Sequence, residues 1–347
     1  MATPLPFVSV VLPVRNEERF IRRCLESVFA QDYPRDRMEV IVADGMSSDG
    51  TREVAAAFRG RHAALRVIDN PGRIVPTGLN AAIGCARGAV IVRVDGHCEI
   101  AADYVRRCVE HLQTGAHAVG GPIETVGETT VARAIALGMS SRFGVGNSAF
   151  RTSSGRTMFV DTVAFPAYPR DVLERVGPFD EELVRNQDDE YNYRLRKLGG
   201  RVLLAADVRA RYYSRSSLAS LWRQYFQYGY WKVRVLQKHP RQMSARQFAP
   251  AVFVLALAMA LVAAAAAPHT SWVALAIAGA YSAAALTASV TVAARDPRAM
   301  PALPLVFAIL HVSYGLGFFR GLAAFRKRWQ HQHDARPRPL PEHSISA

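Results

Sequence analysis

Two long uncharged stretches near the C-terminus limit what this 347-residue chain can fold into more than any other feature. Residues 249–267 and 272–294 contain no Asp, Glu, Lys or Arg. Each stretch reaches the ~20 residues that a helix needs to cross ~30 Å of hydrocarbon. We therefore predict two membrane-spanning helices, with alanine-rich helices buried in a globular core as the alternative.

A third apolar stretch, residues 302–325, is long enough to span but contains His311, Arg320 and several glycines. Such a segment can be a full span, a re-entrant segment or a helix at the membrane interface. Basic residues tend to stay on the cytoplasmic side, and the tail at residues 326–347 is basic. Two crossings keep this tail beside a cytoplasmic N-terminal domain, whereas three do not. We favour two spans in a membrane region at residues 249–325, followed by a disordered basic tail.

The first 120 residues alternate between β-branched apolar runs and helical patterns. The predicted strands and helices follow one another in pairs, at residues 8–14 and 17–31, 39–43 and 51–59, 65–68 and 77–86, and 89–94 and 102–113. This alternation is typical of parallel β-α-β units, whose ligands bind at the carboxyl ends of the strands. No G-x-G-x-x-G follows the first strand, which argues against a dinucleotide site. The sequence predicts a Rossmann-like α/β domain for a nucleotide over residues 1–240.

Charge and cysteine usage restrict the partners and the compartment. A formal net charge of +14 suits nucleic acid, an anionic membrane or a phosphate-rich substrate. The excess positive charge lies in membrane-proximal and tail segments and no nucleic-acid-reading motif appears, so we expect no nucleic-acid partner.

The four cysteines have no C-x-x-C pair and no zinc-ligand spacing, which predicts that they are reduced and serve as packing residues. Residues 1–7 lack a signal-peptide pattern, so we expect a cytoplasmic N-terminal domain.

Polar residues follow the first two predicted strands. Glu17 comes after Pro13, where the first strand turns into a helix. The second strand ends at Asp44, a position that suits an acceptor for a nucleobase imide N–H. The alternative role, an N-terminal helix cap in a solvated turn, better suits Asp49. We therefore predict that Asp44 contacts a nucleotide.

The fourth predicted strand ends in Asp95 and His97, two residues apart. Side chains two apart on an extended strand point to the same side. A carboxylate and an imidazole there can hold Mg²⁺ or Mn²⁺ against a diphosphate, and the imidazole favours Mn²⁺. His97 could instead lie behind the metal ligands or in the core.

Three acidic residues, Asp188, Asp189 and Glu190, stand together immediately before a predicted helix at residues 191–198. Acidic residues are generally favoured at a helix N-terminus, because the macrodipole attracts negative charge there. A carboxylate near a donor site can also deprotonate an attacking hydroxyl as a general base. We expect one of these residues to be such a base.

Residues 215–240 form an aromatic and basic stretch just before the first span. We predict a pair of interfacial helices whose aromatic and basic side chains meet the lipid headgroups. The same residues could also contact the phosphates of a lipid-linked substrate. The residues that we expect near such an acceptor are these five from this stretch, Arg223, Gln224, Gln227, Tyr228 and Trp231, and three from the acidic segment, Gln187, Asp189 and Glu190.

Several motifs occur here in one order that resembles the inverting family 2 glycosyltransferases. The likeness covers about residues 7–240 and is strongest to the succinoglycan-biosynthesis-type membrane glucosyltransferases. The motifs that carry it are VSVVLPVRNEE, VADGMSSDGT, NPGRIVPTGLN, VRVDGH, FGVGNS, VDTVAFPAY, RNQDDEYNYRL and RQYFQYGYWK.

This resemblance implies a GT-A fold and a role for each matching position. Pro13, Glu17 and Asp44 would line the nucleoside site. Asp95 would take the first position of the family's D-x-D metal motif, with His97 in the second. Asp188 would be the catalytic base, with Gln187 in place of the family's glutamate and Glu190 closing that motif.

The resemblance near the membrane is looser. The family's Q-x-x-R-W signature aligns with residues 224–228, in which Gln227 replaces the arginine and Tyr228 the tryptophan. This departure and the small number of apolar stretches favour a single-addition enzyme over a polymer-conducting one.

The resemblance therefore implies a multi-pass inner-membrane enzyme with a cytoplasmic catalytic domain. Its expected donor is UDP-glucose, its cofactor a divalent metal and its acceptor a polyprenyl-linked saccharide. Two alternatives stay open. One is a polyprenyl-phosphate sugar synthase, and the other is a catalytically silent, membrane-anchored nucleotide-sugar-binding subunit.

Overall fold

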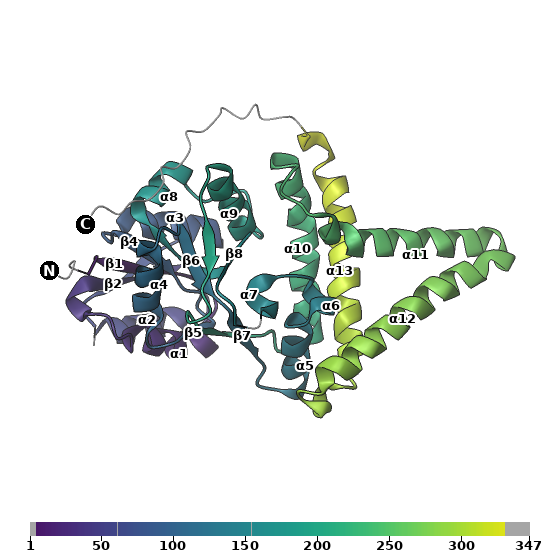
Figure 1. Cartoon of the computed structure of the whole chain (residues 1–347), viewed down its shortest axis with the longest axis horizontal. Coiled ribbons are helices and arrows are strands. Elements are labelled where there is room, and N and C mark those ends of the chain that lie inside the picture. The colour runs from purple at the N-terminus through teal and green to yellow at the C-terminus, as the bar shows by residue number, and fades with distance from the viewer. Residues whose placement is uncertain (1–4, 61, 154, 330–347) are drawn as a thin grey trace. The chain divides into compact units, whose positions relative to one another are not determined.

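A computed structural model describes residues 5–60, 62–153 and 155–329. The chain divides into two compact units (Figure 1). Within the described ranges, the first comprises residues 5–124 and 153–212, and the second comprises residues 125–152 and 213–329. Segment 215–240 thus belongs to the same unit as the apolar helices. The basic tail beyond residue 329 lies outside the described residues.

The first unit begins with four parallel strands, β1 (Val8–Val14), β2 (Met38–Asp44), β3 (Leu65–Asp69) and β4 (Val90–Arg93). Their order in the sheet is β3-β2-β1-β4. The connecting helices are α1 (Glu18–Phe29), α2 (Thr51–Arg59), α3 (Val75–Cys85) and α4 (Tyr104–Gln113). Every residue of β1 and β2 is buried, as expected for a parallel sheet covered on both faces. The predicted β-α-β units are confirmed.

The same sheet continues with strands of mixed direction. Beyond β4 come β9 (Ala164–Pro169), β6 (Ala118–Gly121), β10 (Val202–Leu204) and β8 (Met158–Val160). β9 is antiparallel to β4, so β9 begins at the edge where β4 ends. Two helices, α8 (Arg170–Val176) and α9 (Gln187–Lys197), follow β9. A second sheet has the order β5 (Cys98–Ile100), β11 (Ala210–Tyr213) and β7 (Ile123–Val126).

The second unit is helical. Its helices are α5 (Thr130–Met139), α6 (Arg142–Val145), α7 (Ala149–Thr152), α10 (Leu218–Lys238), α11 (Ala249–Ala266), α12 (Ser271–Ala293) and α13 (Leu303–Ala324). The chain also forms short 3₁₀ turns at Arg35–Arg37, Ala245–Phe248, Pro268–Thr270, Pro297–Ala299 and Arg326–Arg328. The predicted division of residues 215–240 into two helices is wrong, because α10 is one continuous helix that begins with a capping box at Ser217.

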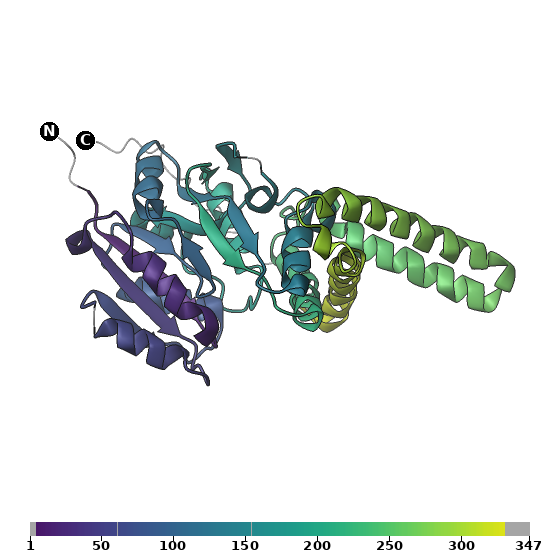
Figure 2. The ribbon, with the colours of Figure 1, turned by 90° about the horizontal axis from the view of Figure 1, so that it is seen from below.

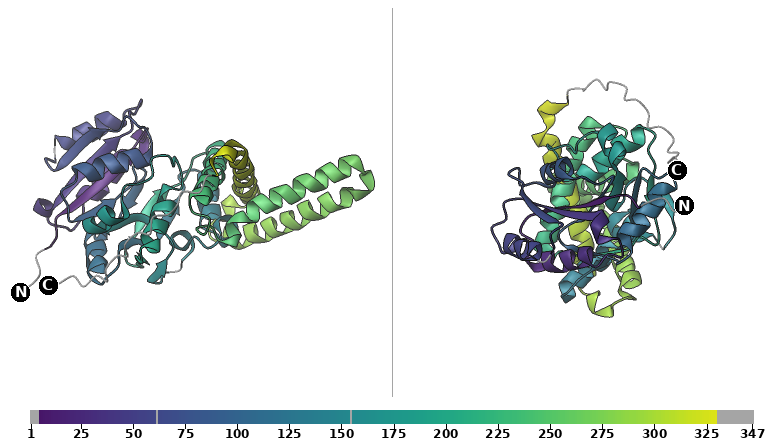
Figure 3. Two further views of the ribbon diagram at one scale, coloured as in Figure 1. Left: turned by 90° about the horizontal axis from the view of Figure 1, so that it is seen from above. Right: turned by 90° about the vertical axis from the view of Figure 1, so that its left-hand side faces the viewer.

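Among the described residues, three helical segments are long and apolar enough to cross a membrane, at residues 245–266, 268–293 and 303–324. Only 11% and 17% of the first two segments is buried, against 50% of the third. The first two are therefore not core helices, and the third differs from them in its surroundings. Within this unit α11 and α12 form a hairpin that extends away from α13 (Figures 2 and 3).

Candidate active site

The carboxyl ends of β1 to β4 meet at one edge of the main sheet, together with the start of β9. In the described part of the chain, five non-glycine residues have positive φ, and all lie in the segments that form this edge or lead into α9. They are Asn16, Met46, Arg73, Phe165 and Asn186. Sparsely populated backbone conformations of this kind cluster at functional sites. The loops at this edge are therefore held in specific shapes.

Asp44, at the end of β2, is 1% exposed, and its carboxylate has hydrogen-bond partners within the chain. Its carboxylate accepts a hydrogen bond of 2.6 Å from the Ser47 hydroxyl and one of 3.3 Å from Arg52. Arg52 also contacts Asp69 at 2.6 Å, at the end of β3. Pro13 lies beside Ala43 in the register of β1 and β2, one residue before Asp44. The structure thus brings Pro13 and Asp44 together, with Ser47 and Arg52 as partners that the sequence did not reveal.

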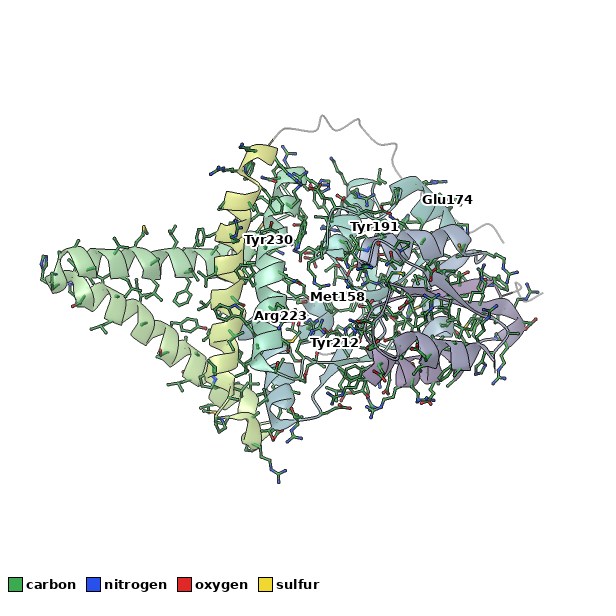
Figure 4. The ribbon with its side chains drawn as sticks, turned by 180° about the vertical axis from the view of Figure 1, so that it is seen from behind. Met158, Glu174, Tyr191, Tyr212, Arg223 and Tyr230 are labelled. Carbon is green, nitrogen blue, oxygen red and sulfur yellow. The ribbon has the colours of Figure 1, made fainter. Side chains whose placement is uncertain are left out.

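Glu17 contacts His97 across the loops that follow β1 and β4. The His97 Nδ1 lies 2.9 Å from the Glu17 Oε1, and the ring packs edge-on against Tyr212, 4.9 Å between centroids (Figure 4). An ionised carboxylate only accepts hydrogen bonds, so Nδ1 donates, and in the neutral imidazole Nε2 then carries the lone pair. Metal-binding histidines are commonly oriented by such a carboxylate. Glu17 therefore orients His97. The sequence placed Glu17 in the nucleoside site and did not predict this contact.

Arg93 joins Asp95 to Asp188. Its Nε and Nη2 each lie 3.0 Å from the Asp95 Oδ1, and its Nη1 contacts the Asp188 Oδ1. Arg93 is buried at the end of β4, whereas Asp188 comes from α9, so the ion pairs link residues 95 apart in the sequence. The predicted metal residue and the predicted base therefore share one guanidinium.

The helix that carries Asp188 begins earlier than predicted. α9 starts at Gln187, so Asp188, Asp189 and Glu190 form its first turn instead of preceding it. Negative charge is favoured there by the macrodipole, and Asn186 leads into the helix with φ of 64°.

Packing around α9 fixes the first turn in place. Glu190 is buried and pairs with Arg194 at 2.7 Å, which gives it a structural partner. Tyr168 on β9 donates to the Asn192 amide oxygen at 3.0 Å. Gln187 is also buried, whereas Asp189 is half-buried. Of the acidic residues in this turn, Asp188 is the one that contacts Arg93.

Burial raises the pKa of the Asp188 carboxyl, and the neighbouring Arg93 guanidinium opposes that rise without cancelling it. The side chain is nevertheless 37% exposed, so a substrate hydroxyl can reach the carboxylate. A partly desolvated carboxyl of raised pKa is a stronger proton acceptor than an ordinary aspartate once it is ionised.

Of the residues predicted near the acceptor, Gln187, Asp189 and Glu190 lie on α9 in the first unit, and the other five lie on α10 in the second. Gln224 is buried, accepts from Arg215 at 3.2 Å and donates to the Tyr228 hydroxyl at 2.9 Å. Trp231 packs against Phe325, 5.6 Å between ring centroids. Arg223 is exposed (Figure 4) and Gln227 is half-buried. Gln224, Tyr228 and Trp231 thus hold this helix in its own unit.

A divalent metal fits this donor set if the substrate supplies the remaining ligands. Among the described residues no three or more His, Cys, Asp or Glu side chains gather into a metal cluster. Asp95 offers its Oδ2, to which Arg93 does not bond, and His97 offers Nε2. Mg²⁺ and related ions at diphosphate sites use one or two protein ligands and take the rest from phosphate and water.

Comparisons with known proteins show the family of the chain and its fold. The profile for Glycosyl transferase family 2 matches residues 9–177. The Succinoglycan biosynthesis protein ExoA of Rhizobium meliloti is 32% identical over 336 residues, which cover 92% of this chain and 96% of that protein. The chain belongs to glycosyl transferase family 2. It is a glycosyltransferase, as the resemblance of its motifs implied.

Other known proteins are similar to part of the chain or to its fold. A Methanococcus voltae dolichyl N-acetyl-α-D-glucosaminyl phosphate 3-β-D-2,3-diacetamido-2,3-dideoxy-β-D-glucuronosyltransferase is 28% identical over 241 residues, 67% of this chain and 74% of that protein. The Pyrobaculum calidifontis mannosyltransferase PcManGT, solved with GDP-Man and Mn²⁺, is 21% identical with a TM-score of 0.59 over 91% of this chain and 88% of its own. The predicted GT-A-like α/β fold is confirmed.

Proposed function

We propose that this chain transfers a hexose, with inversion, from UDP-glucose to a lipid-linked saccharide in polysaccharide or glycolipid synthesis. The observation that carries the proposal is the Arg93 bridge, because it joins a carboxylate suited to a donor site with one suited to deprotonating an acceptor. We assign the transfer chemistry to residues 1–240 and the anchoring to residues 249–325, with the catalytic domain on the cytoplasmic face of an inner membrane.

Each residue of the candidate site has a role in this reaction. Pro13 and Asp44 bind the nucleoside, while Asp95 and His97, the latter oriented by Glu17, hold a divalent metal, Mn²⁺ or Mg²⁺. A bound metal would supply positive charge to the departing nucleotide diphosphate. Asp188 accepts the proton of the acceptor hydroxyl as that oxygen bonds to the anomeric carbon. The bond from this carbon to the diphosphate oxygen breaks on the opposite side, so an α-linked donor gives a β-glycoside.

The names of relatives support a lipid-linked acceptor. The Methanococcus voltae relative is named for adding a sugar to a dolichyl-phosphate-linked sugar, and the Rhizobium meliloti relative is named for succinoglycan biosynthesis. Glucose as the transferred sugar rests on the resemblance to membrane glucosyltransferases. Asp189, Arg223 and Gln227 are the residues that we propose to lie near the acceptor.

The test is a transfer assay with detergent-solubilised protein, a panel of nucleotide sugars and a polyprenyl-lipid extract, in Mn²⁺, Mg²⁺ or EDTA. We expect metal-dependent UDP release and a lipid-linked saccharide heavier by one hexose. Asp188→Asn should lower the rate roughly 100- to 10,000-fold, whereas Asp36→Asn, at an exposed surface residue, should not.

Other outcomes separate the alternatives. A hexose transferred directly to polyprenyl phosphate would identify a polyprenyl-phosphate sugar synthase. Nucleotide-sugar binding without release for any donor would favour a silent subunit, and unchanged turnover in Asp188→Asn would refute the assignment of the base.

A further inference from the structure

Within the second unit, α13 packs along α10 in the same chain direction. Gly317 faces the backbone of Phe226, and Gly321 that of Tyr230. Further along, Gln237 donates to the Phe325 carbonyl at 2.9 Å. Later residues of α10 therefore meet later residues of α13, and glycines let the two helices approach closely.

The first half of α13 packs on a different segment, α5 and α6. Gly138 of α5 faces Val306, and the Phe143 carbonyl lies 2.9 Å from the Nε2 of His311. α13 is thus covered by α5 and α6 near its start and by α10 toward its end, which accounts for the half of it that is buried.

Both of these covering segments follow closely on strands of the three-stranded sheet formed by β5, β11 and β7. α5 begins at Thr130, four residues after β7 ends at Val126. α10 begins at Leu218, five residues after β11 ends at Tyr213. If α13 stood across the membrane, the start of α10 would lie beside the first half of α13 and not at its end, and the polar chain leading to β11 would enter the hydrocarbon.

The charges of α10 give a second argument against a membrane-crossing α13. α10 contains Arg223, Lys232, Arg234 and Lys238 and three glutamines, and it is not among the segments apolar enough to span. Arg223 is exposed and precedes Phe226, the residue at the level of Gly317 in α13. A charged side chain at the bilayer centre is expensive, whereas basic and aromatic side chains are favoured at the headgroups.

The hairpin of α11 and α12 has the opposite character. Its side chains carry no Asp, Glu, Lys or Arg and are largely uncovered, with Val262 70% and Leu275 71% exposed. The hairpin extends away from the pair of α10 and α13, which run side by side (Figures 1 and 2). The end of the hairpin is tied to α5, because Arg133 of α5 forms an ion pair of 3.0 Å with Asp296 in the turn after α12.

We propose that α10 and α13 lie along the membrane surface and contact phospholipid headgroups, and that only α11 and α12 cross the bilayer. The two ends of the hairpin are then on the side of the catalytic unit, and the turn at His269 emerges on the other side. Three basic side chains of α10 that are not buried, Arg223, Arg234 and Lys238, face anionic lipid together with Arg326, Lys327 and Arg328 after α13, whereas Lys232 is buried. This arrangement rests on the membrane association of the chain and not on its sugar chemistry.

Labelling with a membrane-impermeant maleimide tests the number of crossings. Cys85 is exposed and marks the side of the catalytic unit, whereas Cys24, Cys98 and Cys108 are buried. In a Cys85→Ser background we would label His269→Cys and Lys327→Cys in spheroplasts and in inside-out vesicles. Lys327→Cys should react from the side that labels wild-type Cys85, and His269→Cys from the other. Labelling of Lys327→Cys from the side of His269→Cys would overturn the proposal.

Depth measurements distinguish a surface helix from a re-entrant one. Nitroxides on α13 would be placed at three exposed positions, Leu305, Leu316 and Ala323, and compared with Val252, Met259 and Val262 on α11. Collisions with oxygen and with a nickel chelate, in vesicles of phosphatidylcholine and phosphatidylglycerol, report depth. The α13 labels should lie at similar shallow depths, although residues 305 to 323 span ~27 Å of helix, and the α11 labels should pass through the bilayer centre. A deep central label on α13 would refute the proposal. Neither measurement uses transfer activity, so its result stands whether or not the proposed function does.

Discussion

Arg93 is a buried cation between two carboxylates of the candidate site, and its charge affects both of them. It holds the Asp95 Oδ1 at 3.0 Å and opposes the raised pKa of Asp188. Removing it would leave Asp188 desolvated without its nearest positive charge. Arg93 is a positioning residue for the proposed reaction, since it acts through the two aspartates.

We predict that Arg93→Met raises the pKa of Asp188 further and moves the acid limb of the kcat/KM profile to higher pH. A general base works only when ionised, so activity is present above its pKa and lost as the pH falls through it. Arg93→Lys keeps a charge but not the fork of donors, and its acid limb should lie between those of wild type and Arg93→Met. The measurement is the pH profile of UDP release for the three proteins.

A fall in rate with an unchanged pH profile would contradict this prediction, because a purely structural defect does not move a pKa. Circular dichroism of each variant is the control for folding.

Glu17 gives a second prediction at this scale. Glu17→Gln keeps the shape of the side chain but weakens the bond that orients His97, now 2.9 Å long. Replacing such an orienting group typically costs ~10- to 100-fold in metal affinity. We therefore expect a higher half-saturating Mn²⁺ concentration in the presence of UDP, measured by electron paramagnetic resonance. Glu53→Gln, at an exposed position of α2, is the matched control, and equal affinities for the two variants would refute the role of Glu17 in orienting His97 for metal binding.

The sequence could locate some of these residues but not their partners. Asp44, Asp95 and His97 follow predicted strands, and parallel strands bring their carboxyl ends to one edge. Arg93 was missed because its partner Asp188 is 95 residues away and the chain reverses direction through β9 between them. A signal was present, since Arg93 is a charged residue at the end of an otherwise apolar run of a buried strand.

At the scale of elements, glycines at the contact of α10 and α13 give a stability prediction. A side chain at Gly317 or Gly321 would meet the backbone of α10, and overpacking of this kind typically costs about 1–3 kcal/mol. We expect Gly317→Val and Gly321→Val to lower the unfolding temperature of the protein in detergent.

Gly279, on α12, provides the matched control, because nothing lies within 4 Å of the position that a Cβ would take there. Gly279→Ala should be neutral or stabilising by up to ~1 kcal/mol, since alanine favours a helix over glycine. A loss of stability in Gly279→Ala equal to that in Gly317→Val would show that glycine content, and not the contact with α10, is responsible.

The sequence predicted the first strands and helices closely because their pattern is local. Strand 8–14 and helix 51–59 have the same bounds in the structure, and α9 differs at its start because acidic residues suit a first turn as well as the loop before it. The predicted break within residues 215–240 is absent, since Gly229 faces Tyr314 of α13 inside one continuous helix. That packing partner is 85 residues away and leaves no local pattern.

At the scale of the whole molecule, the chain enters the second unit twice. Residues 125–152 join it between two segments of the first unit, and residues 213–329 complete its described part. The apolar residues of α5, among them Ile135 and Met139, are buried there, and Gly138 faces Val306 of α13. Removing α11, α12 and α13 therefore uncovers a segment that lies in the middle of the sequence.

We predict that a chain ending at residue 244 aggregates, although it contains every residue of the candidate site. Without α13, the buried face of α5 would be open to water, and the Phe143 carbonyl would lose the His311 donor that lies 2.9 Å away. Exposed apolar patches of this kind promote association. A chain that ends at residue 212 and has residues 127–152 replaced by a glycine-serine linker should be monomeric, because both parts of the second unit are then absent. Size-exclusion chromatography of the two truncated chains, expressed side by side, checks this.

A monomeric chain of residues 1–244 would mean that α5 is stable without α13. Nucleotide binding by the linked chain would then show that the donor site needs no part of the membrane unit, and transfer by it to a soluble acceptor would show that the membrane unit serves the acceptor alone.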